Sequence, residues 1–537
     1  MRQRSVLITG CSVGGIGHAF VKEFHSRGFK VFATARRPES MSELKGLEGV
    51  VLLKLDVSEI DSIRTAVDEV ASLTGGKLDI LMNNAGQGKP NTLYISPSNT
   101  SSISGVVHFP FNGAYNMSKA ALNSLADALR IELAPFDNIK VVNLITGAVK
   151  SNIHRSKSLP DSSLYKPMEK LYHEKRLQMS KVKAMPTVQY AQQVASEVLK
   201  PKPRAWFWLA NMTTVSWLLN TFFPKTLLDK IMARQFGLNE FAARSVQKNI
   251  VLSPNVKRTV LITGCSAGGI GHALAKEFHS RGERVFATAR NLESMVELER
   301  LGITVLKLDV TKIESIRDAR DKLSVMTGGK LDILVNNAGQ ESIMAVSDMD
   351  MIAARNLFEV NLYGAIAMVQ EFVQLLIMSG NGRVAHVGSI AGIFPLPFSA
   401  SYNGSKAAVH ALSNTLRVEL APFNIKVVNL LTGGVTSNIS RPLFLPENSL
   451  YRPIEQILLQ KRVGISQAMP TAQYARRVAT ELLDSKPRAW FWLGDKSSLC
   501  WIFDTFLWKT SLDGIFIKSF GLSELAGYLR GRKLKAV

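Results

Sequence analysis

The sequence predicts two tandem α/β domains, each a doubly wound parallel β-sheet with helices on both faces. Three observations carry this prediction. The 537 residues are 46% hydrophobic and 20% charged, which is typical of folded chains with more than one core. Short apolar runs alternate with segments of helical periodicity, as in βαβ units. Residues 6–28 and 260–282 differ at only three of 23 positions, which indicates a duplicated unit.

The elements of the first repeat follow from this alternation. Strands are predicted at residues 6–9, 31–34, 51–55, 80–82 and 141–145, and helices at 16–27 and 62–72. The match between the repeats resumes at several later places, ending at residues 204–208 and 488–492. The predicted organisation is an incomplete domain (1–203), an aromatic and basic extension (204–250), a linker (251–257), a complete domain (258–487) and a C-terminal extension (488–537).

Composition narrows the function classes. Three cysteines form no disulfide framework, so a reducing compartment is expected, and the N-terminus lacks the apolar region of a signal peptide. The net charge of +22 favours anionic partners such as phosphates or an anionic membrane surface. No nucleic-acid motif accompanies this charge, and the nine histidines lack metal-ligand spacing, so neither nucleic acid nor a metal is predicted.

A glycine-rich loop follows the first strand of each repeat and opens a helix. Glycines let the backbone approach a pyrophosphate, whose charge is stabilised by the helix N-terminus. This arrangement predicts a Rossmann-type dinucleotide site in each repeat. Its candidate residues are Gly10, Gly15, Ile16 and Gly17 in the first repeat, and Gly264, Ser266, Gly269, Ile270 and Gly271 in the second.

The end of the second strand indicates which dinucleotide is bound. An NAD site needs an acidic residue there to bind the ribose 2′-hydroxyl. Here the strand ends in Arg36 in the first repeat and in Arg290 in the second, with no acid beside them. Because arginine pairs with a 2′-phosphate, NADP(H) is the predicted cofactor.

The same loops also spell Gly-x-Ser-x-Gly, the nucleophile elbow of many ester hydrolases, around Ser12 and Ser266. An elbow needs downstream Asp and His partners and a late strand in the sheet. Both serines follow the first strand of their repeat, and no downstream histidine has a supporting motif. The cofactor loop is therefore favoured over the hydrolase.

Tyr402 and Lys406 lie four residues apart, which places both on one face of a predicted helix. A nearby ammonium favours the phenolate, so we expect the pKa of Tyr402 to be lowered toward a working pH. Ser389 ends a strand 13 residues earlier, where its hydroxyl can bind a carbonyl. Together with the dinucleotide loop, this trio predicts a carbonyl-active site.

These motifs resemble the classical short-chain dehydrogenase/reductase family. The resemblance implies that Tyr402 protonates the carbonyl oxygen, Lys406 holds the nicotinamide ribose, Ser389 orients the carbonyl and Asn361 anchors a relay water. It also implies cofactor contacts by Asp309, Asn337, Ala338, Gly339 and Ser437, and by Asp56 and Asn84 in the first repeat.

A closer resemblance is to the 1-acyldihydroxyacetone-phosphate reductases and their fungal relatives, carried by residues 432–435, 445–451 and an apolar C-terminal extension. It implies NADPH-dependent reduction of a lipid-like ketone at the cytosolic face of the endoplasmic reticulum or lipid droplets, or in the cytoplasm. The alternatives are an oxidoreductase of sterols, retinoids or other hydroxyl lipids, a catalytically idle nucleotide-binding membrane protein, and the hydrolase. The sequence leaves the oligomeric state undecided, with a homo-oligomer as one alternative.

The two repeats are unequal. From Asn336 to Ser389 the second repeat spends 53 residues, whereas the first spends only 19 from Asn83 to Ser102. The missing 34 residues correspond to the stretch that carries Asn361, its helix and the strand leading to Ser389. Residues 87–101 are predicted to be a loop. The first repeat keeps Ser102, Tyr115 and Lys119 at the same spacing, but we expect it to fold irregularly and to be weak or dead as a catalyst.

All seven tryptophans fall in the two predicted extensions, beside phenylalanines and basic residues. This composition suits attachment to a membrane interface or a lid over the substrate cleft. Residues 205–223 are uncharged and near the length of a spanning helix, but they include six polar residues. Interfacial attachment is therefore favoured over a membrane span.

Overall fold

The computed structural model describes residues 2–535 apart from 87–99, 138, 152–157, 181–183, 224, 246–256, 440–442 and 464–467. The chain forms two compact units that do not coincide with the two repeats. Unit 1 comprises Met1–Val107, Ala114–Ala126 and Lys140–Phe223, and unit 2 comprises His108–Gly113, Asp127–Ile139 and Pro224–Val537. Unit 2 thus contains the second repeat together with three segments of the first.

Unit 2 is built on one seven-stranded sheet of order β10-β9-β8-β11-β12-β13-β14, in which every ladder is parallel. The strand order reverses between β8 and β11, where an open α/β sheet binds ligands beyond its carboxyl edge. The strands are β8 (Thr259–Thr263), β9 (Arg284–Ala289), β10 (Thr304–Lys307), β11 (Ile333–Asn336), β12 (Arg383–Val387), β13 (Lys426–Thr432) and β14 (Trp490–Leu493).

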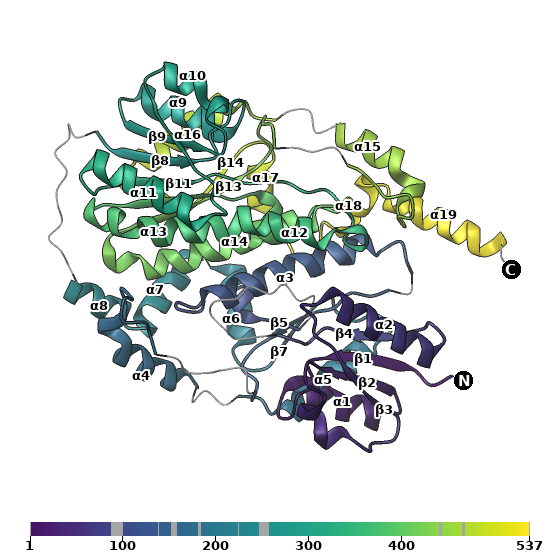
Figure 1. Ribbon diagram of the computed structural model, residues 1–537. Coiled ribbons are helices and arrows are strands. Elements are labelled where there is room, and N and C mark those ends of the chain that lie inside the picture. The colour runs from purple at the N-terminus through teal and green to yellow at the C-terminus, as the bar shows by residue number, and fades with distance from the viewer. Residues whose placement is uncertain are drawn as a thin grey trace. The chain divides into compact units, whose positions relative to one another are not determined.

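Helices cover both faces of this sheet (Figure 1). On one face, α9 and α16 bury a cluster with the strands that includes Phe278, Tyr474 and Phe491. On the other, α11 and α13 bury Leu334, Phe372 and their neighbours. The α-helices of this repeat are α9 (Ile270–Ser280), α10 (Val296–Arg300), α11 (Ile313–Thr327), α12 (Met351–Phe358), α13 (Gly364–Met378), α14 (Ala400–Glu419), α15 (Glu455–Val463), α16 (Thr471–Leu483), α17 (Ser497–Phe506), α18 (Asp513–Ser519) and α19 (Leu522–Lys535).

Short turns connect these elements, and two helices of the first repeat complete unit 2. The turns are η4 (Leu292–Met295), η5 (Val346–Asp348), η6 (Glu359–Tyr363, a π-helical turn), η7 (Ile390–Gly392), η8 (Ala421–Phe423) and η9 (Arg452–Ile454). The two helices are α7 (Lys225–Gln235), which packs on α14, and α8 (Leu238–Ser245), which packs on η8.

Unit 1 contains two parallel sheets, of order β3-β2-β1-β4 and β5-β6-β7. Its strands are β1 (Ser5–Thr9), β2 (Lys30–Ala35), β3 (Val50–Lys54), β4 (Ile80–Met82), β5 (Thr100–Ser102), β6 (Asn143–Thr146) and β7 (Trp206–Leu209). Its other elements are α1 (Ile16–Ser26), η1 (Pro38–Leu44), α2 (Ile60–Thr74), η2 (Ile103–Gly105), η3 (Lys166–Met168), α4 (Glu169–Ser180), α5 (Thr187–Val198) and α6 (Thr213–Phe222); α3 (Gly113–Glu132) passes from unit 1 into unit 2 at Asp127.

The deletion splits the sheet of the first repeat. Three residues of β5 stand where the second repeat has the end of β12, and β4 and β5 form no ladder. The prediction of a loop over residues 87–101 is wrong for Thr100 and Ser101, which lie in β5, while residues 87–99 fall outside the described residues. The first repeat was expected to fold irregularly. Instead it forms two separate sheets, which share one hydrophobic cluster beneath α1 and α5.

The predicted extensions begin before the last strand of each repeat, so they are not separate from the fold. β7 and β14, which hold the Trp-x-Trp segments, are edge strands of their sheets, so the boundaries at residues 204 and 488 cut through the domains. Residues 205–223 do not form a continuous helix, because β7 is followed by positive φ angles at Ala210 and Met212 before α6 starts.

In the described part of the chain, one helical stretch, Met351–Met378, is long and apolar enough to cross a membrane. It comprises α12, η6 and α13, and more than half of its most apolar window is buried inside the protein. Because α13 packs Phe372 and Leu376 into the core beside the sheet, this stretch has the contacts of a core helix.

Candidate active site

The predicted catalytic side chains of the second repeat meet at the carboxyl edge of the sheet. Ser389 lies two residues after the end of β12 and caps η7, and Tyr402 and Lys406 lie one turn apart near the start of α14. Tyr402 makes a hydrogen bond with Ser389. The Lys406 ammonium lies 5.7 Å from the centre of the Tyr402 ring and donates to the Val387 carbonyl at 2.8 Å. The structure therefore brings the predicted trio together.

The tyrosine is shifted in the direction opposite to the expected one. Burial and the charge of Glu341 raise the pKa of Tyr402, and the hydrogen bond with Ser389 lowers it by less. Burial also lowers the pKa of Lys406, to about 8, and desolvation is the largest influence on the phenol. The Tyr402 hydroxyl is therefore protonated, the state in which it can act as an acid.

Asn361 lies in the π-helical turn η6 between α12 and α13 and is 3% exposed. Such turns often occur at functional sites because they re-aim one side chain. The Asn361 Oδ1 accepts from the Gln340 backbone N–H at 2.7 Å, and its Nδ2 donates to the Gln340 carbonyl and to the Ser405 hydroxyl, each at 2.9 Å. Asn361 thus ties the loop after β11 to α14, while the water-anchoring role stays a prediction.

Tight packing at the glycines shapes the glycine-rich loop of the second repeat. Gly264 has φ +73°, and a Cβ atom there would come within 2.9 Å of the Ala338 Cα. A Cβ on Gly271 would clash with the Gly264 carbonyl. The N-cap of α9, Gly269, makes no side-chain capping bond. The first turn of α9 is therefore open to an anionic group, as the sequence predicts.

Asn337 has a structural role in addition to the predicted one. Its Nδ2 donates to the carbonyls of Thr263 and Gly264 at 2.8 and 2.9 Å. The Thr263 hydroxyl in turn accepts from the backbone N–H groups of Asn337 and Ala338, each at 2.9 Å. Asn84 repeats this pattern with Thr9 in the first repeat. The predicted Asn-Ala-Gly segment therefore fixes the loop, and Gly339 lies beside Asn361 and Lys406.

The remaining predicted cofactor residues flank this loop. Arg290 is exposed at the carboxyl end of β9. Burial raises the pKa of Asp309, but hydrogen bonds from Thr311 and, to a smaller extent, the Arg290 charge hold it below its usual value. Arg36 contributes in the same way to Asp56 in the first repeat. Ser437 is half-buried in the segment after β13, where Asn438 Nδ2 donates to the Ala267 carbonyl at 3.2 Å.

The first repeat preserves the local geometry of the trio. Tyr115 makes a hydrogen bond with Ser102, and Lys119 donates to the Thr100 carbonyl at 2.9 Å. Burial raises the pKa of Tyr115 and lowers that of Lys119 to about 8, as in the second repeat. No described residue of the first repeat corresponds to Asn361, since α12, η6 and α13 have no counterparts there.

The hydrolase alternative gains no support from the geometry. The hydroxyl of Ser266 is bonded to that of Ser294 at 3.0 Å, and Ser12 is bonded to Ser40 at 2.9 Å, rather than to an imidazole. Over the described residues, no group of three or more His, Cys, Asp or Glu side chains could hold a metal ion.

His410 is a residue of the site that the sequence reasoning missed. It lies one turn after Lys406 on α14, and its Nε2 accepts the Ser389 backbone N–H at 3.3 Å. Burial and the Lys406 charge lower the pKa of His410 to about 3, so the ring is neutral and can accept this bond. The first repeat has Asn123 at the same place, and this difference within an otherwise similar helix was the available signal.

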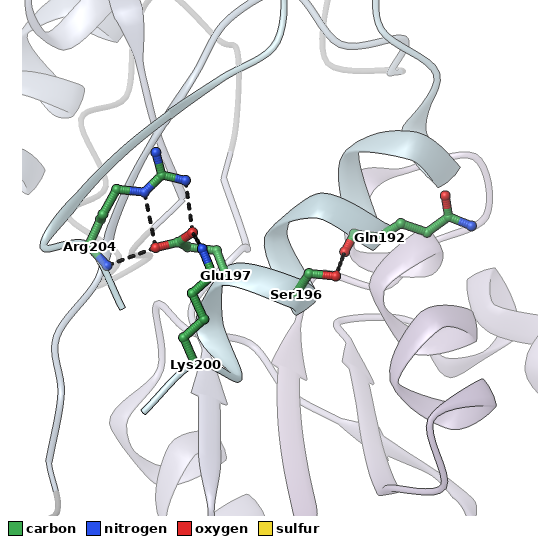
Figure 2. Close-up of polar contacts among 5 residues, drawn as sticks. All are labelled: Gln192, Ser196, Glu197, Lys200 and Arg204. Atoms are coloured by element: carbon green, nitrogen blue, oxygen red, sulfur yellow. Dashed lines mark hydrogen bonds and ion pairs between the residues drawn. The ribbon is translucent and has the colours of Figure 1, made fainter. Parts of the chain in front are cut away.

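A surface pocket of about 470 Å³ in unit 1 lies apart from the Tyr115 trio, beside α5 and β7. Figure 2 shows its polar wall, in which Glu197 accepts from the Arg204 backbone and guanidinium and from the Lys200 ammonium. These bonds, above all those from Arg204, lower the pKa of Glu197 to about 2. Glu481 and Arg488 form the same pair in unit 2, so the arrangement anchors the start of the edge strand in both repeats.

The comparisons with known proteins agree with this geometry. The model of the short chain dehydrogenase family matches residues 4–96, 98–161 and 258–448. The chain belongs to the short chain dehydrogenase family. It is therefore an oxidoreductase, with a tandem pair of parallel-sheet domains of this family's type.

Individual members of the family match about half of this chain at a time. A short-chain dehydrogenase of Pyricularia oryzae, RED1, is 40% identical over 51% of this chain and 99% of its own length. An NADPH-dependent 1-acyldihydroxyacetone phosphate reductase of Schizosaccharomyces pombe is 41% identical over 42% of this chain and 79% of its own length. Among solved structures, a short-chain dehydrogenase of Streptomyces avermitilis covers 52% of this chain and 99% of its own at 26% identity, with a TM-score of 0.42.

Proposed function

We propose that the second repeat is an NADP(H)-dependent reductase of a lipophilic ketone, similar in substrate to 1-acyldihydroxyacetone-phosphate reductases. One observation carries the proposal. The protonated Tyr402 phenol, hydrogen-bonded to Ser389 and beside the Lys406 ammonium, lies at the same sheet edge as the open N-terminus of α9. A dinucleotide held at that terminus would face the phenol across the carboxyl ends of β8, β11 and β12.

The side chains divide the work of ketone reduction. NADPH, when bound, supplies the hydride that reduces the carbonyl carbon. Tyr402 donates its proton to the carbonyl oxygen, and the Ser389 hydroxyl orients that oxygen by a hydrogen bond. Lys406 carries its charge below pH 8 and stabilises the phenolate that remains on Tyr402. His410 and Asn361 keep Ser389 and the neighbouring loop in place.

The residues at the dinucleotide end fit NADP(H). Arg290 follows β9 directly, at the position from which an acid would bind an unphosphorylated ribose, and its guanidinium suits a 2′-phosphate. A relative supports this choice, since the reductase of Schizosaccharomyces pombe is named NADPH-dependent.

Exposed apolar side chains near the site support a lipid-like substrate. The segment after β13 begins at the catalytic edge of the sheet and carries Phe444, which is 79% exposed, and Leu450. Its neighbours Leu443 and Leu445 are buried, so the segment is anchored while Phe444 stays available to an acyl chain. The net charge of +22 favours a phosphorylated substrate.

We also propose interfacial attachment to the cytosolic face of the endoplasmic reticulum or of lipid droplets. The face of α17 and the turn after it expose Leu499, Trp501, Phe506 and Trp508, and Trp508 is 67% exposed. The corresponding helix of the first repeat, α6, exposes Val215, Leu218 and Phe222. Aromatic side chains on short amphipathic helices suit the headgroup region of a bilayer.

The reductase proposal is tested by NADPH oxidation with 1-acyldihydroxyacetone phosphate. The full chain should turn over, and Tyr402→Phe should abolish turnover while NADPH binding, followed by cofactor fluorescence, persists. Turnover that survives Tyr402→Phe would exclude the mechanism. No turnover by the unmodified chain would reject the lipid phosphate, and sterol and retinoid ketones would be assayed next.

The membrane proposal is tested by sedimentation with vesicles of phosphatidylcholine, with and without phosphatidic acid. Replacement of Phe506 and Trp508 by serine should reduce binding at least tenfold. Val325→Ser is the matched control, because Val325 is 86% exposed on α11, away from the aromatic helices. Equal binding by all three proteins would reject α17 as the attachment site.

A further inference from the structure

A buried carboxylate supplied by the first repeat lies among the loops of the second. Glu132 is the last residue of α3, belongs to unit 2 and is 1% exposed. Its Oε1 accepts the backbone N–H of Phe398 at 2.8 Å, and its Oε2 accepts that of Val346 at 2.8 Å. Both oxygens thus bind backbone groups of the second repeat. Burial raises the pKa of Glu132 to about 7, and the bonds from Val346 and Phe398 offset part of that shift.

Phe398 needs this support because its backbone is strained. Its φ of +63° is a conformation that bulky side chains rarely adopt. The Phe398 carbonyl accepts from Met344 at 2.7 Å, and its ring packs edge-on against Tyr451 at 5.0 Å. The Tyr451 hydroxyl in turn donates to the Glu132 carbonyl at 3.0 Å. Glu132 is therefore bonded both to the strained residue and to the ring that packs against it.

The two backbone groups held by Glu132 flank the catalytic centre. Phe398 lies four residues before Tyr402 and next to Ser399, the N-cap of α14. Val346 opens η5, at the end of the loop that leads from Gly339 past the Gln340 backbone bound by Asn361. Met344 and Ser399 also form a β-bridge, so the two loops are linked directly by that bridge and again through the two oxygens of Glu132.

A reciprocal contact lies in unit 2, in which a glutamate of the second repeat binds a backbone N–H of the first. Glu419, the counterpart of Glu132 at the end of α14, accepts the backbone N–H of Phe111 at 2.6 Å, and Phe111 has φ +61°. Two ion pairs are reciprocal as well: Arg130 of the first repeat binds Asp513 of the second, and Arg417 of the second binds Asp229 of the first. Each repeat therefore holds the turn before the other's catalytic helix.

We propose that Glu132 is a positioning residue for the second active site, so that the degenerate first repeat is required for the chemistry of the second. The proposal rests on the proposed reductase function for its catalytic consequence. Its structural part is independent of the substrate: without the Glu132 carboxylate, the Phe398 turn relaxes and Tyr402 loses its alignment with Ser389. Misplacement by about 1 Å is enough to cost on the order of 100-fold in rate.

The test compares Glu132→Gln with Glu419→Gln in the full chain. Glutamine keeps the size of the side chain but has only one acceptor oxygen. Its NH₂ group would face one of the two backbone N–H groups, so one of the two hydrogen bonds would be lost. We expect Glu132→Gln to lower kcat 10- to 100-fold with the Kd for NADPH unchanged, and Glu419→Gln to keep kcat within twofold. Amide hydrogen exchange should accelerate over residues 343–348 and 396–402 only in Glu132→Gln.

Each result decides the proposal. Unchanged hydrogen exchange and kcat in Glu132→Gln would overturn the positioning role. An equal loss of kcat in Glu419→Gln would also overturn it, because it would show that both glutamates only stabilise the fold. If Glu132→Gln does not fold, Val346→Pro removes one donor at a position that accepts proline and should give a smaller loss of kcat. If the unmodified chain shows no Tyr402-dependent reduction, the reductase function fails, while hydrogen exchange still tests the role of Glu132.

Discussion

The two repeats bury one face of their sheets alike and the other face very differently. Beneath α9 and α16 of the second repeat and beneath α1 and α5 of the first, large clusters form around equivalent residues such as Phe278 and Phe24. On the opposite face the second repeat buries 18 residues in one cluster, whereas the cluster described in the first contains only Phe32, Leu53 and Val70. The removed segment contains α13, which supplies much of that face.

This difference shows which part of the fold the catalytic geometry depends on. The Ser102, Tyr115 and Lys119 trio keeps its local geometry without that sheet face. Leu144 anchors β6 in the intact cluster beneath α5, β6 pairs with β5, and the Thr100 carbonyl of β5 accepts from Lys119. What the deletion removes is the segment that carries Asn361 and the link from the loop after β11 to the catalytic helix. Local geometry and a complete site are thus separable.

Replacement of the two tyrosines gives the largest expected contrast. Tyr402→Phe should lower kcat by about 10²- to 10⁴-fold, because the general acid is lost. Tyr115→Phe should leave kcat within twofold, since its repeat lacks the Asn361 segment. Steady-state NADPH oxidation by the two variants measures this, and an equal loss in both would show that the repeats share the catalysis.

Leucine truncation on the depleted face measures the stability difference directly. Leu334 of β11 is fully buried, whereas its counterpart Leu81 of β4 is 47% exposed. Leu334→Ala should lower the free energy of unfolding by about 2–5 kcal/mol, and Leu81→Ala by less than about 1 kcal/mol. Hydrogen exchange of β8 and β1 in a denaturant series reads the two units separately. A similar loss of unfolding free energy in both variants would contradict the conclusion that the sheet face around Leu81 is poorly covered.

Charge reversal at the end of the second strand separates nucleotide binding in the two repeats. Arg290→Asp should raise the KM for NADPH about 10- to 100-fold and improve the use of NADH, because an acid binds the free ribose hydroxyls and repels a 2′-phosphate. Arg36→Asp should leave both kinetic constants unchanged. If Arg36→Asp alters turnover to the same degree, the first repeat binds the cofactor that is used.

The pH profile gives the smallest contrast. Burial lowers the pKa of Lys406 and of Lys119 to about 8, so each ammonium is present below pH 8 and is lost as the pH rises through that value. The kcat/KM should therefore fall about fivefold between pH 8 and pH 9. Lys119→Arg should leave this fall unchanged. If the fall in kcat/KM were absent in Lys119→Arg, the ammonium that titrates would be that of the first repeat.

Much of the fold could be predicted because it is local in the sequence. Apolar runs and glycine positions located β1 to β4 within one or two residues, since buried parallel strands are short and bounded by turn residues. The Trp-x-Trp strands β7 and β14 were missed, because their aromatic residues also fit an interfacial helix and only pairing with β6 and β13 distinguishes the two.

The site was predictable where spacing alone defines it. Tyr402, Lys406 and Ser389 meet as expected, since one helix and one strand end carry them. The direction of the Tyr402 pKa was wrong, because desolvation depends on how many distant segments cover the phenol. His410 and Glu132 were missed for the same reason, as both act through contacts with residues far away in the chain.

By itself, the sequence determined the duplication, the α/β class, the glycine-rich loops and the spacing of the predicted catalytic residues, since each of these depends on neighbours within a few turns of chain. The tertiary structure decided that the first sheet splits in two, that Asn361 clamps a loop, and that Glu132 of one repeat holds the Phe398 turn of the other. These features arise from burial and pairing between residues that are tens to hundreds of positions apart, which no local pattern records.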